Sequence, residues 1–379
     1  MMNRVLPRLL ASCLALAMQW VQAADGVSPQ QIVIGQNITL QGGKNDYGTA
    51  VQEGIQVYLS AVNSRGGVNG RHIALKTLDD DNKAAQAEAN ARQLVAQDKV
   101  FILFGSIEGG PSTAVMKAAI ELNVPFFGPI AGSPTLRRPY QPLVFPVRAE
   151  HREEFRALML YAKSTGATRV AFMRSDSETG QQHLANVKLL CTELGMELAA
   201  DLPFKSDVSD VQLDQLAAQL EKGRVQMVFN HGSPGVYEKL IRKARAKGVQ
   251  ASFFGVNSGS AQMVRHLGPL APGMVFTQVV PSPWERKTAI TREYQEEFGR
   301  QKPGREFSYG SLEGYLTAKA LVAALRLAGS NPTRESFLAG LANAKLDLNG
   351  LHAVYGKDLH VGLSFVDLAI VTREGKFRH

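Results

Sequence analysis

The chain has 379 residues, more than a single hydrophobic core usually serves, so two or more domains are expected. With 45% apolar and 20% charged residues, the composition is that of a globular protein and excludes a disordered or fibrous chain. The formal net charge of +8 is spread along the chain and forms no dense basic block, which argues against nucleic-acid binding.

The N-terminal residues have the anatomy of a secretory signal peptide. Two arginines precede an apolar stretch over residues 9–21, and the small-residue pattern Val21-Gln22-Ala23 follows. We therefore predict a signal peptide over residues 1–23, cleaved after Ala23 or Ala24, and an exported mature protein. The alternative is a lipoprotein signal that ends at Cys13, but too little of the apolar stretch precedes that cysteine.

Short apolar runs alternate with helical patterns along the rest of the chain. The runs are QIVIGQNI, HIALKTLD, VFILFG, VPFFGPI, RVAFMR, VQMVFNHG, SFFGVN and GMVFTQVV. Amphipathic helices are predicted over residues 48–63, 83–97, 112–122, 151–164, 180–194, 235–246 and 311–327. Strands that are apolar nearly throughout and alternate with helices are typical of parallel sheets covered on both faces. The pattern therefore predicts an α/β protein with two doubly wound, Rossmann-like lobes.

The candidate site lies in the loops that follow the strands, because open parallel sheets bind ligands beyond the carboxyl ends of their strands. These loops cover residues 39–47, 106–112, 130–135, 175–180, 231–235 and 256–260. They are rich in Gly, Ser, Asn, Thr and Pro, a composition that suits a pocket of hydrogen-bond donors and acceptors better than a phosphate cradle.

Catalytic and cofactor motifs are missing from the sequence. The segment 255–259 approaches a hydrolase elbow, but its serine stands one place late, and neither a dinucleotide nor a Walker motif occurs. The acidic run Asp79-Asp80-Asp81 lacks the spacing of a calcium loop and is interpreted as a capping and solvated loop. The eight histidines contain no pair at helical ligand spacing, so no metal site, no cofactor and no enzyme activity are predicted.

Two long segments carry a family resemblance. They are GGVNGRHIALKTLDDDNKAAQAEANARQLV from Gly66 and VFILFGSIEGGPSTAVMKAAIELNVPFFGPIAGSPTL from Val100. Both resemble the periplasmic branched-chain amino acid (Leu/Ile/Val) binding protein family, the type I receptors of ABC importers. Later segments, including RVAFMRSDSETG and SLEGYLTAKALVAAL, extend the resemblance over essentially all of the mature chain.

The resemblance implies the type I periplasmic binding protein fold, in which three hinge crossings join two lobes and the ligand is trapped between them. The crossings are expected near residues 145–148, 275–280 and 351–355. Lobe one would then comprise residues 25–147 plus 278–352, and lobe two residues 148–277 plus 353–379.

The resemblance also implies the pocket residues, position by position. Lobe one would contribute Tyr47, Ile107, Glu108, Gly109, Gly110, Ser112, Ile130, Ala131, Gly132 and Ser133, with Tyr309 near the rim of the cleft. Lobe two would contribute Thr179, Ser233 and Asn257.

The sequence departs from the family's pattern at three of these positions. Gly109 and Gly132 replace the hydroxyl side chains that grip a ligand carboxylate, and Asn257 replaces the acid that meets the ammonium. A buried ammonium without a carboxylate partner is unfavourable, so derivatives, small organic acids and amides compete with free amino acids as the cargo. Glu108 would either replace the missing acid or face solvent. Lys44 would either meet an anionic group or be an ordinary exposed lysine.

The function implied is that of a monomeric periplasmic receptor. It would trap a small molecule, either an amino acid, an amino acid derivative or a small organic acid or amide, and deliver it to the membrane permease of an ABC importer. The alternative is a periplasmic sensor that passes its closed state to a signalling membrane protein.

Overall fold

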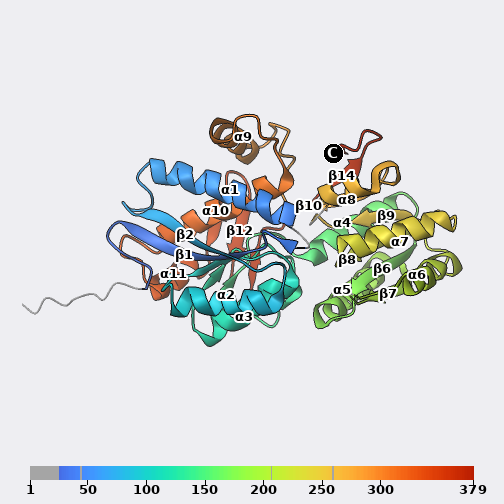
Figure 1. Ribbon diagram of the computed structural model, residues 1–379, viewed down its shortest axis with the longest axis horizontal. Coiled ribbons are helices and arrows are strands. Elements are labelled where there is room, and N and C mark those ends of the chain that lie inside the picture. The colour runs from blue at the N-terminus through green and yellow to red at the C-terminus, as the bar shows by residue number, and fades with distance from the viewer. Residues whose placement is uncertain (1–24, 43–44, 206, 258–259) are drawn as a thin grey trace, which may run out of the picture.

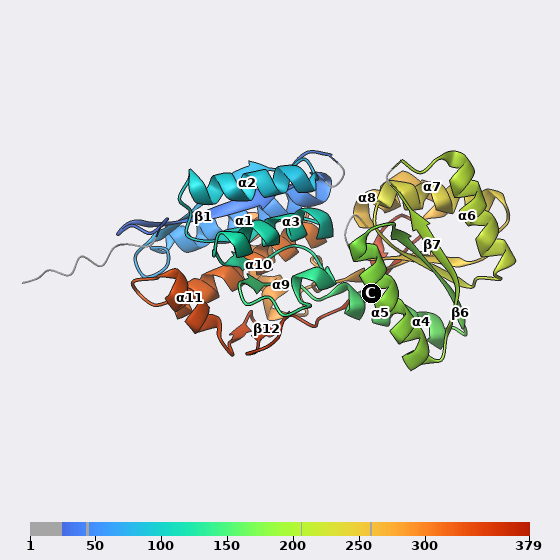
Figure 2. The same cartoon turned by 90° about the horizontal axis from the view of Figure 1, so that it is seen from below.

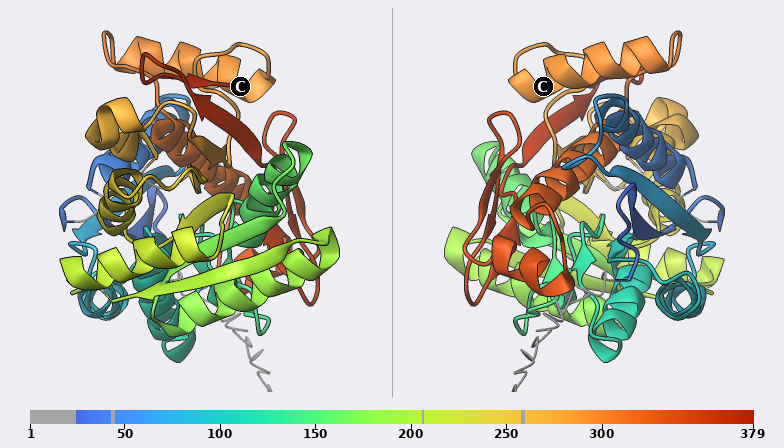
Figure 3. Two further views of the ribbon diagram at one scale, coloured as in Figure 1. Left: turned by 90° about the vertical axis from the view of Figure 1, so that its right-hand side faces the viewer. Right: turned by 90° about the vertical axis from the view of Figure 1, so that its left-hand side faces the viewer.

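The computed structural model describes residues 25–42, 45–205, 207–257 and 260–379, which form two lobes lying end to end (Figures 1 and 2). The predicted signal peptide, residues 1–23, and Lys44 lie outside the described residues. Each lobe is built around one main sheet with helices on both of its faces, as the end-on views show (Figure 3). The prediction of two doubly wound α/β lobes is therefore confirmed.

Lobe one contains a five-stranded sheet of order β2-β1-β3-β4-β5, and all of its strand pairs are parallel. The strands are β1 (Gln31–Ile38), β2 (His72–Asp79), β3 (Leu103–Gly105), β4 (Phe126–Phe127) and β5 (Val144–Phe145). Figure 1 shows α1 (Asn45–Ser64) and α10 (Tyr309–Leu327) above this sheet and α2 (Ala84–Ala96) and α3 (Gly109–Glu121) below it. Separate hydrophobic clusters fill the two faces, and α9 (Ala289–Gln301) and α11 (Arg334–Leu341) join the upper one.

Lobe two contains a seven-stranded sheet of order β15-β14-β10-β9-β8-β6-β7. Its strands are β6 (Arg169–Ser175), β7 (Glu197–Phe204), β8 (Met227–His231), β9 (Ser252–Gly255), β10 (Val275–Gln278), β14 (Asp367–Val371) and β15 (Phe377–Arg378). The strands pair in parallel from β7 to β10, whereas β14 and β15 add antiparallel pairs. One face is covered by α4 (His151–Ser164) and α5 (Glu178–Leu194), and the other by α6 (Asp210–Lys222), α7 (Pro234–Ala246) and α8 (Ser260–Leu267).

The third connection between the lobes lies later in the chain than the sequence predicted. A small antiparallel sheet of β11 (Lys345–Asp347), β12 (His352–Tyr355) and β13 (His360–Gly362) follows α11. The buried side chains Ala353 and Tyr355 of this sheet, and Leu363 directly after it, belong to the core of lobe one. Residues 353–363 therefore pack with lobe one and not with lobe two, and the chain enters the sheet of lobe two only at β14. The prediction erred because these short strands alternate buried and exposed residues and lack the apolar runs of the main sheets.

Local sequence explains several helix starts. The Ser177 hydroxyl accepts a hydrogen bond from the Gly180 backbone N–H at 3.1 Å at the start of α5, and Ser209 forms a capping box with Gln212 at the start of α6. All seven predicted helices occur, and their ends lie within three residues of the predicted ends. No helix in the described ranges has the length and apolar character needed to span a membrane.

Candidate functional site

Both sheets have a topological switch point at the face where the lobes meet. In lobe one the order reverses between β1 and β3, and in lobe two between β6 and β8. At such a point neighbouring loops run to opposite faces of the sheet and leave a crevice beyond the strand ends. The loops after these four strands carry most of the predicted pocket residues, so the two switch points define the candidate site.

The loop after β3 is held in an uncommon backbone conformation. Ser106 and Glu108 have φ angles of 79° and 71°, in the left-handed region that side chains other than glycine rarely adopt. Ile107 between them is fully buried and pairs with Ile130 in an isolated parallel bridge. This bridge ties the loop after β3 to the loop after β4. Strain of about 1–3 kcal/mol at each such residue is typical of functional loops, where the surrounding structure imposes the conformation.

The predicted lobe-one residues Ile107–Ser112 and Ile130–Ser133 are brought together by this bridge. Most of them are buried, but Gly110 is exposed and Glu108 is half-buried. Three hydroxyls are hydrogen-bonded in a row. Thr135 Oγ1 lies 2.8 Å from Ser133 Oγ and also 2.8 Å from Thr113 Oγ1. These contacts fix the wall that lobe one presents to lobe two.

The two glycines that replace hydroxyl residues both face lobe two. A Cβ atom at Gly109 would lie 3.4 Å from the Ser133 Cβ and 3.6 Å from the Thr179 methyl group. A Cβ atom at Gly132 would lie 2.7 Å from the backbone nitrogen of His151, which donates a hydrogen bond to the Gly132 carbonyl at 2.9 Å. Gly132 therefore permits a close approach of α4, and any side chain there would force the walls apart.

Of the remaining predicted pocket residues, some lie beside the switch-point loops of lobe one and others do not. Thr179 lies at the first turn of α5, against Gly109, whereas the Ser233 side chain is exposed and caps α7. Tyr309 is buried, but it contacts Trp284 edge-on at 5.2 Å and hydrogen-bonds to His379 near the C-terminus. Burial raises the pKa of the Tyr309 hydroxyl well above its ordinary value. This residue therefore joins the lobes at a second contact, separate from the switch-point loops.

Tyr47 and Asn257 meet across the lobes at a carboxylate that the sequence did not indicate. The Tyr47 hydroxyl donates to Glu313 on α10, and the Asn257 side-chain amide donates to the same oxygen of Glu313 at 3.0 Å. Asn257 also contacts the Tyr47 hydroxyl at 3.2 Å. Burial raises the pKa of Glu313, and the nearby Arg148 offsets this only in part. A carboxylate from lobe one therefore lies beside Asn257, although the sequence has no acid at position 257.

Helix packing explains how α10 brings Glu313 to Tyr47. A Cβ atom at Gly54 of α1 would lie 1.8 Å from the Ser311 carbonyl oxygen, and one at Gly314 of α10 would lie 2.0 Å from the Val51 carbonyl oxygen. Only glycine allows the two helices to approach so closely. The small residues on both helices could have indicated close helix packing from the sequence alone. Their positions, however, do not reveal which two helices pack together.

A buried ion pair lies beside this junction. Arg148 and Glu154 are bonded to each other and almost fully buried, at 2% and 0% exposure, and Glu313 Oε1 lies 3.7 Å from the Arg148 guanidinium. Thr277 donates to Glu154 at 2.6 Å, and the Asn257 backbone N–H donates to the same oxygen at 3.2 Å. Burial alone would raise the pKa of Glu154, but Arg148, His151 and Thr277 outweigh it and lower the pKa to about 2. Glu154 is therefore ionised at neutral pH.

The acidic run Asp79-Asp80-Asp81 at the end of β2 is not the solvated loop that the sequence suggested, because Asp80 is buried. Asp80 is fully buried and accepts hydrogen bonds from Asn37 Nδ2 and Thr39 Oγ1, both at 2.6 Å. Asp79 accepts from the Leu40 backbone N–H at 2.9 Å. Burial raises the pKa of Asp80. The run therefore anchors the loop after β1, at the switch point of lobe one, because Asn and Thr at the end of β1 supply the donors.

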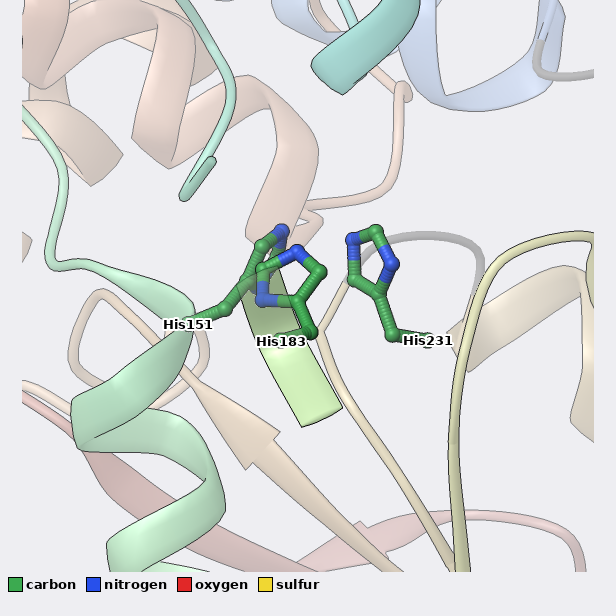
Figure 4. A group of neighbouring side chains, drawn as sticks. All are labelled: His151, His183 and His231. Atoms are coloured by element: carbon green, nitrogen blue, oxygen red, sulfur yellow. The ribbon is translucent and has the colours of Figure 1, made fainter. Parts of the chain in front are cut away.

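Three of the eight histidines lie close together in space, although no pair has helical ligand spacing in the sequence. His151, His183 and His231 come from α4, α5 and the end of β8, and their rings gather at one point behind the wall of lobe two (Figure 4). One ring nitrogen from each lies within 4.8 Å of the others. Separations of 32 and 48 residues hide this cluster from any search for short ligand motifs.

The family assignment follows from a comparison with known proteins. The family model described as periplasmic binding protein matches residues 31–361. The chain belongs to the periplasmic binding protein family. This family consists of solute-binding proteins of the ABC transporter type and not of enzymes, in agreement with the sequence prediction.

Individual relatives of this periplasmic binding protein are distant. It is 24% identical over 317 residues to the Leu/Ile/Val-binding protein homolog 2 of Brucella abortus (strain 2308), with 83% of each chain covered. The crystal structure of a substrate-binding periplasmic protein from Ralstonia solanacearum matches with a TM-score of 0.81 and 23% identity, over 92% of this chain and 99% of that one. A fatty acid ABC transporter substrate-binding protein from Thermomonospora curvata matches with a TM-score of 0.80 and 20% identity. The match covers 93% of this chain and 92% of the other. These structures confirm the type I periplasmic binding protein fold.

Proposed function

We propose that this protein is the periplasmic receptor of an ABC importer and that its solute is an amino acid or a close derivative, held between the lobes and presented to a membrane permease. The observation that carries the proposal is the junction of Tyr47, Glu313 and Asn257, which supplies a buried carboxylate where the sequence indicated none. A buried carboxylate from lobe one removes the main objection to an ammonium group in the cleft.

Acceptor atoms at this junction suit a cation. Among the described residues, Asn257 Oδ1 and Glu313 Oε1 have no hydrogen-bond partner, although both side chains are about 1% exposed. Burial of acceptors without hydrogen bonds is unfavourable, and the Arg148 guanidinium approaches Glu313 Oε1 only to 3.7 Å. An ammonium group has three N–H donors with which to satisfy these acceptors. Burial raises the pKa of Glu313 and so disfavours its charged form. A cation bound beside it would stabilise that form.

Donor groups in the neighbouring loops of lobe one suit an anion. The helix α3 begins at Gly109, and the backbone N–H groups of a first helical turn have no partner within the helix. In the described part of the chain, the buried Ser106 and Ser112 hydroxyls also have no hydrogen-bond partner. Donors on one side and acceptors on the other match a molecule that carries both a carboxylate and an ammonium group.

The comparison proteins support the transport role more strongly than the cargo. Relatives are named for leucine, isoleucine and valine, while a protein of the same fold is named for a fatty acid. The fold therefore leaves the cargo open, and the cargo proposal rests on the acceptors around Glu313.

The test is a calorimetric screen of the mature protein with amino acids, followed by analogues of each ligand that lack the ammonium or the carboxylate. Loss of one charge-assisted hydrogen bond corresponds to about 1.5–3 kcal/mol, so each analogue should bind roughly 10- to 150-fold more weakly. The variant Glu313→Gln should weaken the amino acid more than its deaminated analogue. The control Glu293→Gln alters a carboxylate of α9 that binds Lys319 and should change neither affinity. Equal affinity for the amino acid and its deaminated analogue would refute the proposed cargo.

A further inference from the structure

Three imidazole rings converge inside lobe two, next to the cleft. His151 opens α4, His183 lies on α5, and His231 ends β8, so three separate elements direct their side chains to one point (Figure 4). One nitrogen of each ring lies within 4.8 Å of the others. Atoms that bind one metal ion at about 2.0–2.1 Å lie some 3–4 Å apart, so small side-chain movements bring these nitrogens to coordination distance.

The cluster is buried, and one ring lacks any hydrogen bond. His183 is 0% exposed, and within the described ranges neither of its ring nitrogens has a hydrogen-bond partner. His151 and His231 are 5% and 7% exposed. The neutral form of an imidazole ring is the one that binds a metal ion.

The surroundings of His151 resemble those of a metal ligand. Its Nδ1 atom lies 2.7 Å from Glu154 Oε1, and Thr277 holds the other oxygen of that carboxylate at 2.6 Å. A carboxylate on one ring nitrogen fixes the ring orientation and the tautomer, which leaves the other nitrogen as the donor atom. The charge of Glu154 also offsets part of the positive charge that an ion would bring, although Arg148 shares this carboxylate.

Aromatic packing is the competing explanation of the cluster. The His183 and His231 ring centroids are 3.9 Å apart, and the Phe155 ring packs against His183 at 5.4 Å. Packing alone would be served at least as well by apolar rings, because a buried imidazole without hydrogen bonds loses its hydration and gains nothing in return. The geometry of the cluster and the two His183 nitrogens without hydrogen bonds together favour a polar occupant over packing alone.

We propose that His151, His183 and His231 bind one divalent transition metal ion, for which zinc is the probe. Three nitrogen ligands suit zinc, copper, nickel and cobalt, and a three-ligand site leaves a further coordination position for water or a carboxylate. All three ligands belong to lobe two, so the ion binds without closure of the cleft. The site goes beyond the proposed transport function, because it exists whether or not the solute is an amino acid.

The experiment uses the mature protein without a histidine tag, freed of metal by a chelator that is then removed. Zinc is titrated by calorimetry against a competing chelator, and cobalt is titrated by visible absorption, both without added solute. We expect one ion per protein and the intense absorption of cobalt with nitrogen ligands. His183→Gln should weaken binding by ~100-fold or more, a larger loss than the 10- to 100-fold typical of residues that only orient a ligand. His266→Gln removes an exposed histidine of α8 and should bind as the wild type does.

Two results would overturn the proposal. One is a wild-type protein that binds no stoichiometric zinc, and the other is a His183→Gln protein that is folded and binds zinc as tightly as the wild type does. If His183→Gln fails to fold, His231→Gln replaces it and the same criterion applies. Because no solute is present, failure here leaves the proposed transport function intact, and failure of the solute screen leaves the metal site intact.

Discussion

The buried pair of Arg148 and Glu154 offers the sharpest test of the electrostatics beside the cleft. The change Glu154→Gln keeps the size of the side chain and removes the charge that Arg148, His151 and Thr277 hold in place. It leaves the Arg148 guanidinium with Glu313 as its remaining carboxylate, at 3.7 Å. We expect a large loss of stability at neutral pH, since a buried cation loses its closest partner.

The magnitude follows from the pKa of Glu154. Its ordinary value is 4.5, and its value in the folded protein is about 2, so at 1.36 kcal/mol per pH unit the charged form is stabilised by about 3 kcal/mol on folding. Because the folded pKa is the lower one, this stability is fully present above pH 4.5 and is lost as the pH falls towards 2. At pH 3 about 1.4 kcal/mol should remain, less than half of the value at pH 7.

Thermal unfolding followed by circular dichroism measures this loss. For about 350 residues that unfold together, 3 kcal/mol corresponds to a decrease of about 4 °C in the midpoint, and for a lobe of about 150 residues to about 10 °C. The control Glu193→Gln removes an exposed carboxylate that pairs with Arg152 and Arg156, and it should shift the midpoint by less than about 1 °C. The reasoning fails if both variants unfold at the same temperature at pH 7, or if the effect of Glu154→Gln is as large at pH 3 as at pH 7.

Two further predictions concern the cleft. Tyr47→Phe removes the hydroxyl that donates to Glu313, so calorimetry should show solute affinity about 10-fold lower and thermal unfolding nearly unchanged. Gly132→Ala places a methyl group 2.7 Å from the His151 backbone nitrogen and should disfavour closure, which would lower solute affinity at least ~10-fold and enlarge the ligand-bound protein in small-angle scattering. Gly235→Ala, whose new methyl group would have no neighbour within 4 Å, is the control and should bind solute normally.

Sequence reasoning predicted the elements that have a strong local signal. The helix over residues 151–164 was predicted to the residue, since its apolar face and its flanking loops are clear. The strand β7 was missed because it is an edge strand with mostly half-buried residues, so its apolar signal is weak. The helix α9 was missed for a similar reason. Its buried face includes the polar residues Thr291 and Gln295, so its apolar periodicity is weak.

Sequence reasoning named loops at the candidate site but not the charged groups beside them. Loops after strands could be recognised one at a time, and the pairing of Asn257 with Tyr47 places two predicted residues in contact. Glu313 was missed because it lies in the middle of a helix predicted only to cover the sheet, with no loop signal beside it. The histidine cluster was missed because its members are separated by whole elements, and only the winding of lobe two brings them together.

The two buried carboxylates respond differently to movement of the lobes. Glu154 is bonded to Arg148 at the first connection and to Thr277 of lobe two, so this pair can persist when the cleft opens. Glu313 meets Asn257 across the cleft, so opening returns its carboxylate to water. Closure without a solute therefore buries a charge that burial disfavours, as the raised pKa of Glu313 shows. A solute cation at this point would offset that cost, which makes closure depend on the solute and gives an importer a means to distinguish loaded from empty receptors.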